Sequence, residues 1–209
     1  MLKKNFSVII KLVFVSMIAV SSVALVYILT KSRIISQKNN YQKKILNEIL
    51  PNLRFENLNI SCYTIKNKLL GDERNHKFWM IKKQNNLIAV VFEAVAPDGY
   101  SGNINMIISL TLNRKILGVR VLEHHETPGL GDKIDIRISD WITKFSGMTV
   151  LGENDPNFSL KKYGGKIDQF TGATITPLSI INAIKRIVYL VENTEFKHLT
   201  FKHCKFHYE

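Results

Sequence analysis

A ten-residue segment in the last quarter of the chain combines the residue types that can hold a phosphate. It reads DQFTGATITP and runs from Asp168 to Pro177. Gly172 and Ala173 are small enough to let a bulky group approach the backbone, and the hydroxyls of Thr171 and Thr174 flank them. A helix expected directly afterwards would turn free amide N–H groups and the positive end of its dipole toward Thr174 Oγ1. The segment therefore predicts a site for a phosphate, either bound or covalently attached.

The carboxylate of Asp168 is close enough in sequence to act on a threonine hydroxyl or to hold a metal ion. A glycine-containing loop before a helix is also an ordinary structural turn, so these residues alone leave both interpretations open. The sequence shows no nucleophile–histidine–aspartate arrangement and no P-loop that would indicate an independent catalytic site.

Strand-like segments precede this loop and would help to position it. Residues Leu87 to Val95 are rich in β-branched side chains and are followed by a Pro-Asp-Gly turn at 97–99. Residues Ile104 to Leu112 alternate between the two faces of a strand, and Asn113-Arg114-Lys115 separates them from the segment ILGVRVLEHH. This spacing predicts an antiparallel hairpin.

Two helices are expected behind the strands. A short one should run from Asp140 to Phe145, with Ser139 or Asp140 as its cap. A longer one should follow Thr176, the expected N-cap, and Pro177, the expected first helical residue. Its apolar stripe consists of Ile180, Ile181, Ile184, Ile187, Val188 and Val191. Strands followed by helices predict an α+β domain.

The run from Leu12 to Thr30 contains 19 residues and no charge, which is long enough for a helix to cross a bilayer. A cleaved signal peptide is the alternative, with Ser22-Val23-Ala24 as the possible cleavage site. Apolar residues continue beyond that site, so we favour an uncleaved single-pass anchor. Basic residues lie on both sides of the run, and their count is a weak guide to orientation.

Length and composition allow one globular domain with an additional segment. Of the 209 residues, 45% are hydrophobic, which excludes a wholly disordered chain. Two cysteines exclude a disulfide-rich scaffold and any all-cysteine metal site. The expected organisation is an anchor at 1–30, a helical stalk at 31–51, a globular domain at 52–195 and a basic tail at 196–209.

The net charge of +12 raises nucleic acid and an anionic membrane surface as possible partners, but a solvated surface explains it better than a nucleic-acid footprint. Lysine outnumbers arginine 22 to 7, and the lysines are scattered in the manner of a solvated surface. His124 and His125 lack the helical spacing of a metal site. Pairing of Cys62 with Cys204 stays open. A metal site in the tail is the weaker alternative to a solvated tail, its possible ligands being His198, His203, Cys204 and His207.

The pattern Asp168-x-x-Thr171-Gly172-Ala173-Thr174 resembles the flavinylation motif of the FMN-binding domain of respiratory electron-transport subunits. Three further stretches occur upstream in the matching order: GYSGNI at 99–104, GVRVLEHHETPGLGDKI at 118–134 and SDWITKF at 139–145. Together with the N-terminal anchor, they resemble the G-type subunits of the Rnf/Rsx ion-translocating electron-transport complexes. The likeness covers nearly the whole chain and is densest from 99 to 190.

The resemblance implies that FMN is joined through its phosphate to Thr174 Oγ1 as a phosphoester. A separate flavin transferase, using FAD and magnesium, would make that bond. The residues that the transferase would read, and that would then shape the phosphate end of the site, are Asp168, Thr171, Gly172 and Ala173. Residues 52–195 would form an antiparallel-sheet FMN-binding domain on the periplasmic side of the inner membrane.

A second loop, Glu126 to Gly131, is expected against the flavin ring. Its glycines, Gly129 and Gly131, allow the backbone to approach a planar ligand closely. The side chains that could contact the ring are those of Glu126, Thr127 and Leu130. A plain turn rich in proline and glycine is the alternative. Trp79 and Trp141 are expected in the hydrophobic core rather than against a ligand.

The expected function is therefore that of a membrane-anchored electron-transfer protein without substrate chemistry of its own. Its expected partners are the other membrane and peripheral subunits of the complex, the flavin transferase and the lipid bilayer, but not nucleic acid. The alternative is an anchored domain that binds a ligand or partner without covalent attachment and has no redox role.

Overall fold

The computed structural model describes residues 2–50, 58–152, 154–194, 196 and 202–204, which form two compact units. The first unit, Met1–Lys44, is helical throughout its described part and belongs to helix α1, Leu2–Ile49. Its apolar side chains are exposed, and α1 is long and apolar enough to cross a membrane. A helix that shows apolar side chains on every face requires an apolar surrounding such as a bilayer.

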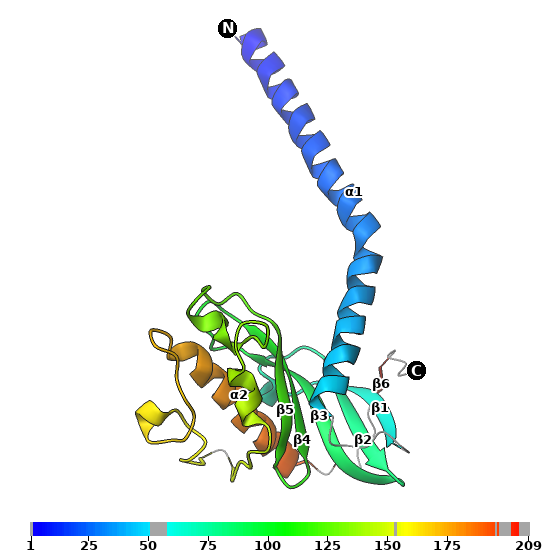
Figure 1. The fold of residues 1–209 in the computed structure, drawn as a ribbon. Helices are drawn as coiled ribbons and strands as arrows, with labels where there is room; N and C mark the ends of the chain where they lie inside the picture. The colour runs from blue at the N-terminus through cyan, green and yellow to red at the C-terminus, as the bar shows by residue number, and fades with distance from the viewer. Residues whose placement is uncertain (1, 51–57, 153, 195, 197–201, 205–209) are drawn as a thin grey trace. The chain divides into compact units, whose positions relative to one another are not determined.

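The second unit, Ile45–Glu209, is built on one antiparallel sheet with the strand order β5-β4-β3-β2-β1-β6 (Figure 1). The strands are β1 Leu58–Ile65, β2 His76–Lys83, β3 Asn86–Ala96, β4 Ile104–Thr111, β5 Ile116–Glu123 and β6 Lys202–His203. The predicted hairpin is β4–β5, in which Ser109 lies opposite Gly118. Arg114 in its turn has a φ of 62°.

One face of the sheet packs against α2, Ile175–Glu192, whose buried residues include the predicted apolar stripe. The opposite face is covered by the last turns of α1, where Ile45, Leu46 and Ile49 pack with Trp79 and other strand residues. Short 3₁₀ helices lie at Lys68–Leu70, Gly131–Ile134, Trp141–Phe145 and Lys161–Tyr163. The predicted α+β class with an antiparallel sheet and one N-terminal apolar helix is confirmed.

One helix prediction needs correction. Helix α2 begins at Ile175, so its N-cap position is Thr174, and Thr176 lies inside the first turn. The hydroxyl of Thr176 is used in a buried tertiary hydrogen bond instead of a cap. The short helix predicted at Asp140–Phe145 is present as a 3₁₀ helix at Trp141–Phe145, with Asp140 at its N-cap position. Ser139 Oγ accepts a hydrogen bond from the Trp141 amide. Trp79 and Trp141 are both buried, as predicted.

Candidate functional site

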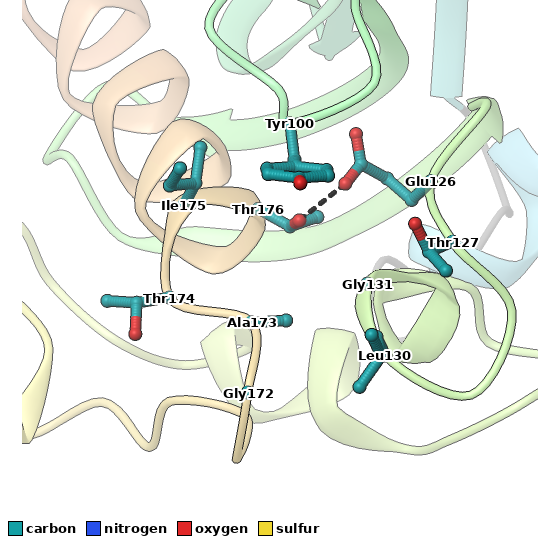
Figure 2. Close-up of a pocket in the computed structure, with 10 residues that line it drawn as sticks. All are labelled: Tyr100, Glu126, Thr127, Leu130, Gly131, Gly172, Ala173, Thr174, Ile175 and Thr176. Atoms are coloured by element: carbon teal, nitrogen blue, oxygen red, sulfur yellow. Dashed lines mark hydrogen bonds between the residues drawn. The ribbon is translucent and has the colours of Figure 1, made fainter.

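The two predicted loops meet in a pocket of about 320 Å³ beside the N-terminus of α2 (Figure 2). Three chain segments contribute: the turn after β3, the loop after β5, and the segment that leads into α2. The lining residues are Tyr100, Glu126, Thr127, Leu130, Gly131, Gly172, Ala173, Thr174, Ile175 and Thr176. The structure thus brings together two loops that lie more than 40 residues apart in sequence.

Seven of the ten predicted site residues line this pocket: Glu126, Thr127, Leu130, Gly131, Gly172, Ala173 and Thr174. Gly129, Thr171 and Asp168 do not. Sequence reasoning missed Tyr100, Ile175 and Thr176. The first of these lies within the GYSGNI stretch, whose glycines indicate a turn but whose pattern does not single out a ligand contact.

The segment that carries Thr174 is fixed by a tight turn and an aromatic anchor. Gly172 has a φ of 80°, which side chains with a Cβ rarely adopt, and a Cβ there would lie 3.4 Å from Leu130 Cδ2. The Ala173 amide donates to the Phe170 carbonyl at 3.2 Å. The Phe170 ring lies edge-on to Trp141, with the ring centroids 4.9 Å apart. The backbone before Thr174 is therefore held in one conformation.

Thr174 itself is half-buried and stands at the N-cap position of α2. Its carbonyl accepts a hydrogen bond from the Leu178 amide at 3.3 Å, but its side chain makes no capping hydrogen bond. The hydroxyl oxygen of a threonine at this position usually accepts a hydrogen bond from a helix amide. Thr174 lines the pocket beside the positive end of the helix dipole, and no capping hydrogen bond occupies its hydroxyl.

Glu126 joins all three segments of the site. Its carboxylate is 5% exposed; Oε1 accepts from the Ser101 amide at 3.0 Å, and Oε2 accepts from Thr176 Oγ1 at 2.5 Å (Figure 2). A Cβ on Gly131 would come within 2.8 Å of Oε2, and one on Gly99 within 3.0 Å of Oε1. Both carboxylate oxygens are thus enclosed and accept hydrogen bonds, so Glu126 links the turn at Ser101 to the start of α2.

The start of the 126–131 loop is supported by His124. The Glu126 amide donates to His124 Nδ1 at 3.2 Å, and His124 Nε2 lies 3.7 Å from a carboxylate oxygen of Asp135. Burial of the Asp135 carboxyl favours its neutral form, but hydrogen bonds from Arg137 outweigh burial and lower its pKa, with a further contribution from His124. His124 is therefore engaged in positioning the loop.

Asp168 lies outside the pocket and is paired with lysines. Its carboxylate oxygens are 2.5 Å from Lys161 Nζ and 3.9 Å from Lys144 Nζ. The hydrogen bond from Lys161 lowers the pKa of this carboxyl, and burial acts weakly in the opposite direction. The Asp168 carbonyl accepts from Trp141 Nε1 at 2.7 Å, which ties its backbone to the core.

A metal site was the weaker alternative for the C-terminal tail. Among the described residues, no group of three or more His, Cys, Asp or Glu side chains is arranged to hold a metal ion. His198 and His207, two of the possible tail ligands, lie outside the described residues. The other two possible ligands, His203 and Cys204, are described and lie at the β1 edge of the sheet.

The pocket is bordered by large apolar side chains that are open to solvent. Tyr100 is 69% exposed, Ile175 50% and Leu130 42%. Grouped exposed apolar side chains around a cavity with a few polar groups are typical of a ligand site. The arrangement offers apolar surface for a flat ring, and a hydroxyl with a helix N-terminus for an anionic group.

The FMN-binding domain family matches residues 99–189, which include every residue that lines the pocket. The G subunit of an ion-translocating oxidoreductase complex from Buchnera aphidicola subsp. Baizongia pistaciae is 54% identical over 188 residues, covering 88% of the chain and 87% of that protein. The equivalent protein of Buchnera aphidicola subsp. Schizaphis graminum is 46% identical, covering 86% and 89%. That of Salmonella typhi is 48% identical, covering 82% and 84%.

Proposed function

Because the chain belongs to the family of G subunits of ion-translocating oxidoreductase complexes and contains an FMN-binding domain, we propose that it carries electrons through FMN esterified at Thr174. The observation that carries this proposal is Thr174 itself, which lines the pocket at the start of α2 and whose side chain makes no capping hydrogen bond. When bound, FMN supplies one- and two-electron transfer, and the protein supplies its position and surroundings.

The residues around Thr174 suit the phosphate end of FMN. The first turn of α2 leaves backbone N–H groups without intrahelical partners, and these groups and the helix dipole stabilise negative charge. Gly172 and Ala173 keep the approach to the backbone free of bulky side chains. A link through the phosphate leaves the ring system unmodified, so it does not alter the redox chemistry that the flavin supplies.

The other side of the pocket suits the ring. Tyr100, Leu130 and Ile175 provide exposed apolar surface, and covering it with a flat ligand would remove it from water. Glu126 would act as a positioning residue, because both of its oxygens already hold the turn at Ser101 and the start of α2. Asp168 and Thr171 would serve recognition by the flavin transferase, since neither lines the pocket.

The proposed membrane anchor would determine where this electron transfer takes place. We propose that α1 holds the flavin domain on the periplasmic side of the inner membrane, within reach of the other subunits of the complex. Tethering a carrier to the membrane that holds its partners raises the effective concentration of each transfer pair. A covalent bond would prevent loss of the flavin outside the cytoplasm, where free FMN would be scarce.

The test is flavin fluorescence on a denaturing gel of the full chain, co-expressed with an FAD-dependent flavin transferase. We expect a fluorescent band for wild type, none for Thr174→Ala, and a weaker band for Thr171→Ala, which keeps the attachment atom. No fluorescence on the wild-type band, or fluorescence that survives Thr174→Ala, would contradict attachment at this hydroxyl. The first result would favour the alternative of a domain that binds a ligand without covalent attachment.

A further inference from the structure

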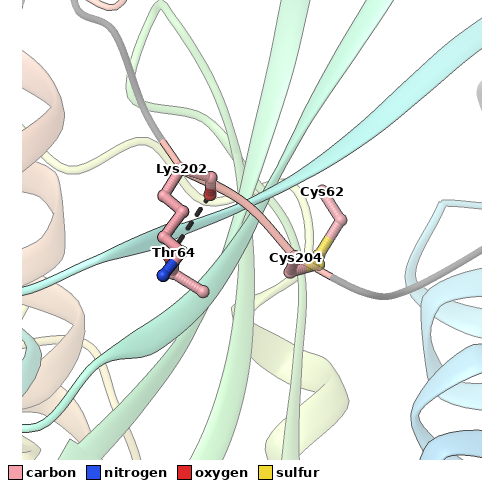
Figure 3. The surroundings of a disulfide bond; sticks show 4 residues. All are labelled: Cys62, Thr64, Lys202 and Cys204. Atoms are coloured by element: carbon pink, nitrogen blue, oxygen red, sulfur yellow. Dashed lines mark hydrogen bonds between the residues drawn. A yellow bond between two sulfur atoms is a disulfide. The ribbon is translucent and has the colours of Figure 1, made fainter.

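Cys62 and Cys204 are 142 residues apart in sequence but lie side by side at one edge of the sheet (Figure 3). Their Cα atoms are 5.4 Å apart, a separation that a disulfide spans without backbone movement. We propose that these cysteines form an intrachain disulfide that fastens the C-terminal segment to the sheet, and that the bond forms in an oxidising compartment. This inference is independent of the flavin and of Thr174.

The register of the backbone brings the two sulfur atoms together. Strand β6 pairs antiparallel with β1, so that His203 faces Tyr63 and Lys202 faces Thr64. The Cys204 amide donates to the Cys62 carbonyl at 3.2 Å, and Thr64 Oγ1 donates to the Lys202 carbonyl at 3.2 Å (Figure 3). These contacts pair the two backbones at the cysteines and on one side of them, and they do not involve sulfur.

A two-residue strand at a sheet edge is too short to stay paired through its backbone bonds alone. The ring contact between Tyr63 and His203, with centroids 4.6 Å apart, adds a modest amount of packing. A covalent bond between residues so distant in sequence restricts the unfolded chain strongly, which favours the folded state. The disulfide is therefore the interaction best able to keep β6 on the sheet.

The surroundings protect such a bond once it has formed. Cys62 is 7% exposed and belongs to the apolar cluster that contains Trp79 and Ile81, and Cys204 packs against this cluster. A reducing thiolate has to reach a sulfur atom to break the bond, so burial slows reduction. Both cysteines of the chain are used in this pair.

Formation of the bond removes two protons and two electrons from the two thiols. The acceptor we propose is the disulfide of a dithiol/disulfide oxidoreductase, which forms a mixed disulfide with one cysteine and leaves as a dithiol when the second cysteine attacks. In the cytosol, by contrast, protein thiols are kept reduced. The bond would therefore place the domain outside the cytoplasm, on evidence separate from any likeness to other proteins.

The experiment counts free thiols in the full chain. Cells expressing it are quenched in acid, which stops thiol exchange before lysis, and the denatured protein is labelled with a maleimide-linked polyethylene glycol. We expect no mobility shift without reductant and two additions after reduction. Cys62→Ser should leave one free thiol without reductant, and Cys204→Ser should do the same.

Two additions on unreduced wild type would overturn the proposal, and so would a reductant-sensitive dimer on a non-reducing gel. A second measurement avoids the variants and uses amide hydrogen exchange of the wild-type chain before and after mild reduction. Faster exchange at the Cys204 amide after reduction would support a fastening role, whereas unchanged exchange would contradict it. Loss of the disulfide and loss of flavin fluorescence are separate outcomes, so each proposal can fail alone.

Discussion

At the scale of single residues, the site depends on one buried hydrogen bond. Thr176 Oγ1 donates to Glu126 Oε2 at 2.5 Å, and the two side chains are 1% and 5% exposed. A buried carboxylate oxygen that loses its donor keeps the cost of desolvation without compensation. The bond therefore helps to hold the 126–131 loop against the start of α2.

Thr176→Val should destabilise the domain by about 2–3 kcal/mol, because it keeps the shape of the side chain and removes the donor. Thr176→Ser keeps the donor and should cost about 1 kcal/mol or less. The free energy of unfolding of the full chain in detergent, from urea titration, measures both. Equal losses for the two variants would show that packing of the threonine methyl matters more than its hydroxyl.

Seven of the ten residues that line the pocket could be predicted from the sequence, because they lie in two short loops rich in glycine and threonine. Thr174, Gly172 and Leu130 follow from local composition, from the expected helix and from the family likeness, and they line the pocket. The prediction of Thr176 as a helix cap is wrong, because cap chemistry is visible locally and a partner 50 residues away is not. The ion pairs of Asp168 with Lys144 and Lys161 could not be predicted, because they depend on the tertiary positions of the two 3₁₀ helices that carry these lysines.

At the scale of elements, the tight turn before β2 is stabilised by charge. Asp72 accepts hydrogen bonds from the Arg74 amide at 2.9 Å and from Arg74 Nε at 2.6 Å, and His76 Nε2 lies 2.7 Å away. Burial opposes ionisation of Asp72, but these bonds outweigh burial and lower its pKa to about 2. The folded state is therefore more stable when the Asp72 carboxyl is ionised than when it is protonated.

The stabilisation by Asp72 should depend on pH in a defined direction. Because the pKa of this carboxyl in the folded state lies below its ordinary value of 3.8, the contribution is complete above about pH 4 and disappears as the pH falls toward 2. Asp72→Asn should cost about 1 kcal/mol at pH 7, reduced by the partial exposure of the cluster, and almost nothing at pH 2. Urea titrations of both proteins across this range measure the difference.

The matched control for this experiment is Glu73→Gln. Glu73 pairs with Lys68 at 3.1 Å, but both side chains are mostly exposed. Exposed pairs contribute little, so the control should lie within about 0.5 kcal/mol of wild type at every pH. A gap between Asp72→Asn and wild type that stays constant from pH 7 to pH 2 would argue against a role of charge.

The last turn of α1 approaches the backbone of β5 very closely at Gly118. A Cβ on Gly118 in β5 would lie 2.9 Å from Ile49 Cβ and 3.2 Å from Ile49 Cα. Gly118→Ala should therefore displace the last turn of the helix and destabilise the unit by about 1–3 kcal/mol. The matched control is Ser109, the buried residue opposite Gly118 in β4, whose hydroxyl has no hydrogen-bond partner among the described residues. Removing this hydroxyl by Ser109→Ala should therefore leave the stability unchanged or raise it. Similar losses for both variants in urea titration would contradict this explanation.

The element pattern is predictable where hydrophobic periodicity is strong. Strands β3, β4 and β5 and helix α2 follow from alternation and from the apolar stripe, and the structure has all four. Strand β1 is not predicted, because most of its residues are only partly buried and alternate weakly. Strand β6 has two residues and depends on pairing with a distant segment, which no local pattern can reveal.

At the scale of the whole molecule, a long apolar helix and an FMN-binding domain are encoded in separate parts of one chain. The apolar helix is recognisable from composition alone, because 19 uncharged residues match the thickness of a bilayer. The domain needs long-range contacts for its site, which unites residues from 100 to 176. An uncleaved anchor and a cleaved signal peptide have the same apolar run, so the fate of the first 24 residues needs a measurement.

The intact mass of the protein purified from membranes distinguishes these two possibilities. We expect a chain that retains its residues up to Ala24 and resists extraction by alkaline carbonate, because apolar residues continue to Leu29. A mature chain that begins after Ala24 and washes off the membrane would identify the run as a signal peptide. Flavin attachment at Thr174 would remain possible in that case.

The side of the membrane on which the domain lies has to be tested separately, because charge does not decide it. Three lysines precede the apolar run, at 3, 4 and 11, and five basic residues follow it, at 31, 33, 38, 43 and 44. A simple count would keep the domain in the cytoplasm, but long domains are exported largely regardless of such charges. We expect a C-terminal fusion to a reporter enzyme that is active only after export to be active in whole cells, and a fusion to a reporter that is active only in the cytoplasm to be inactive. The opposite pattern would contradict both the periplasmic placement and the compartment required by the Cys62–Cys204 bond, while leaving the pocket and its hydroxyl in place.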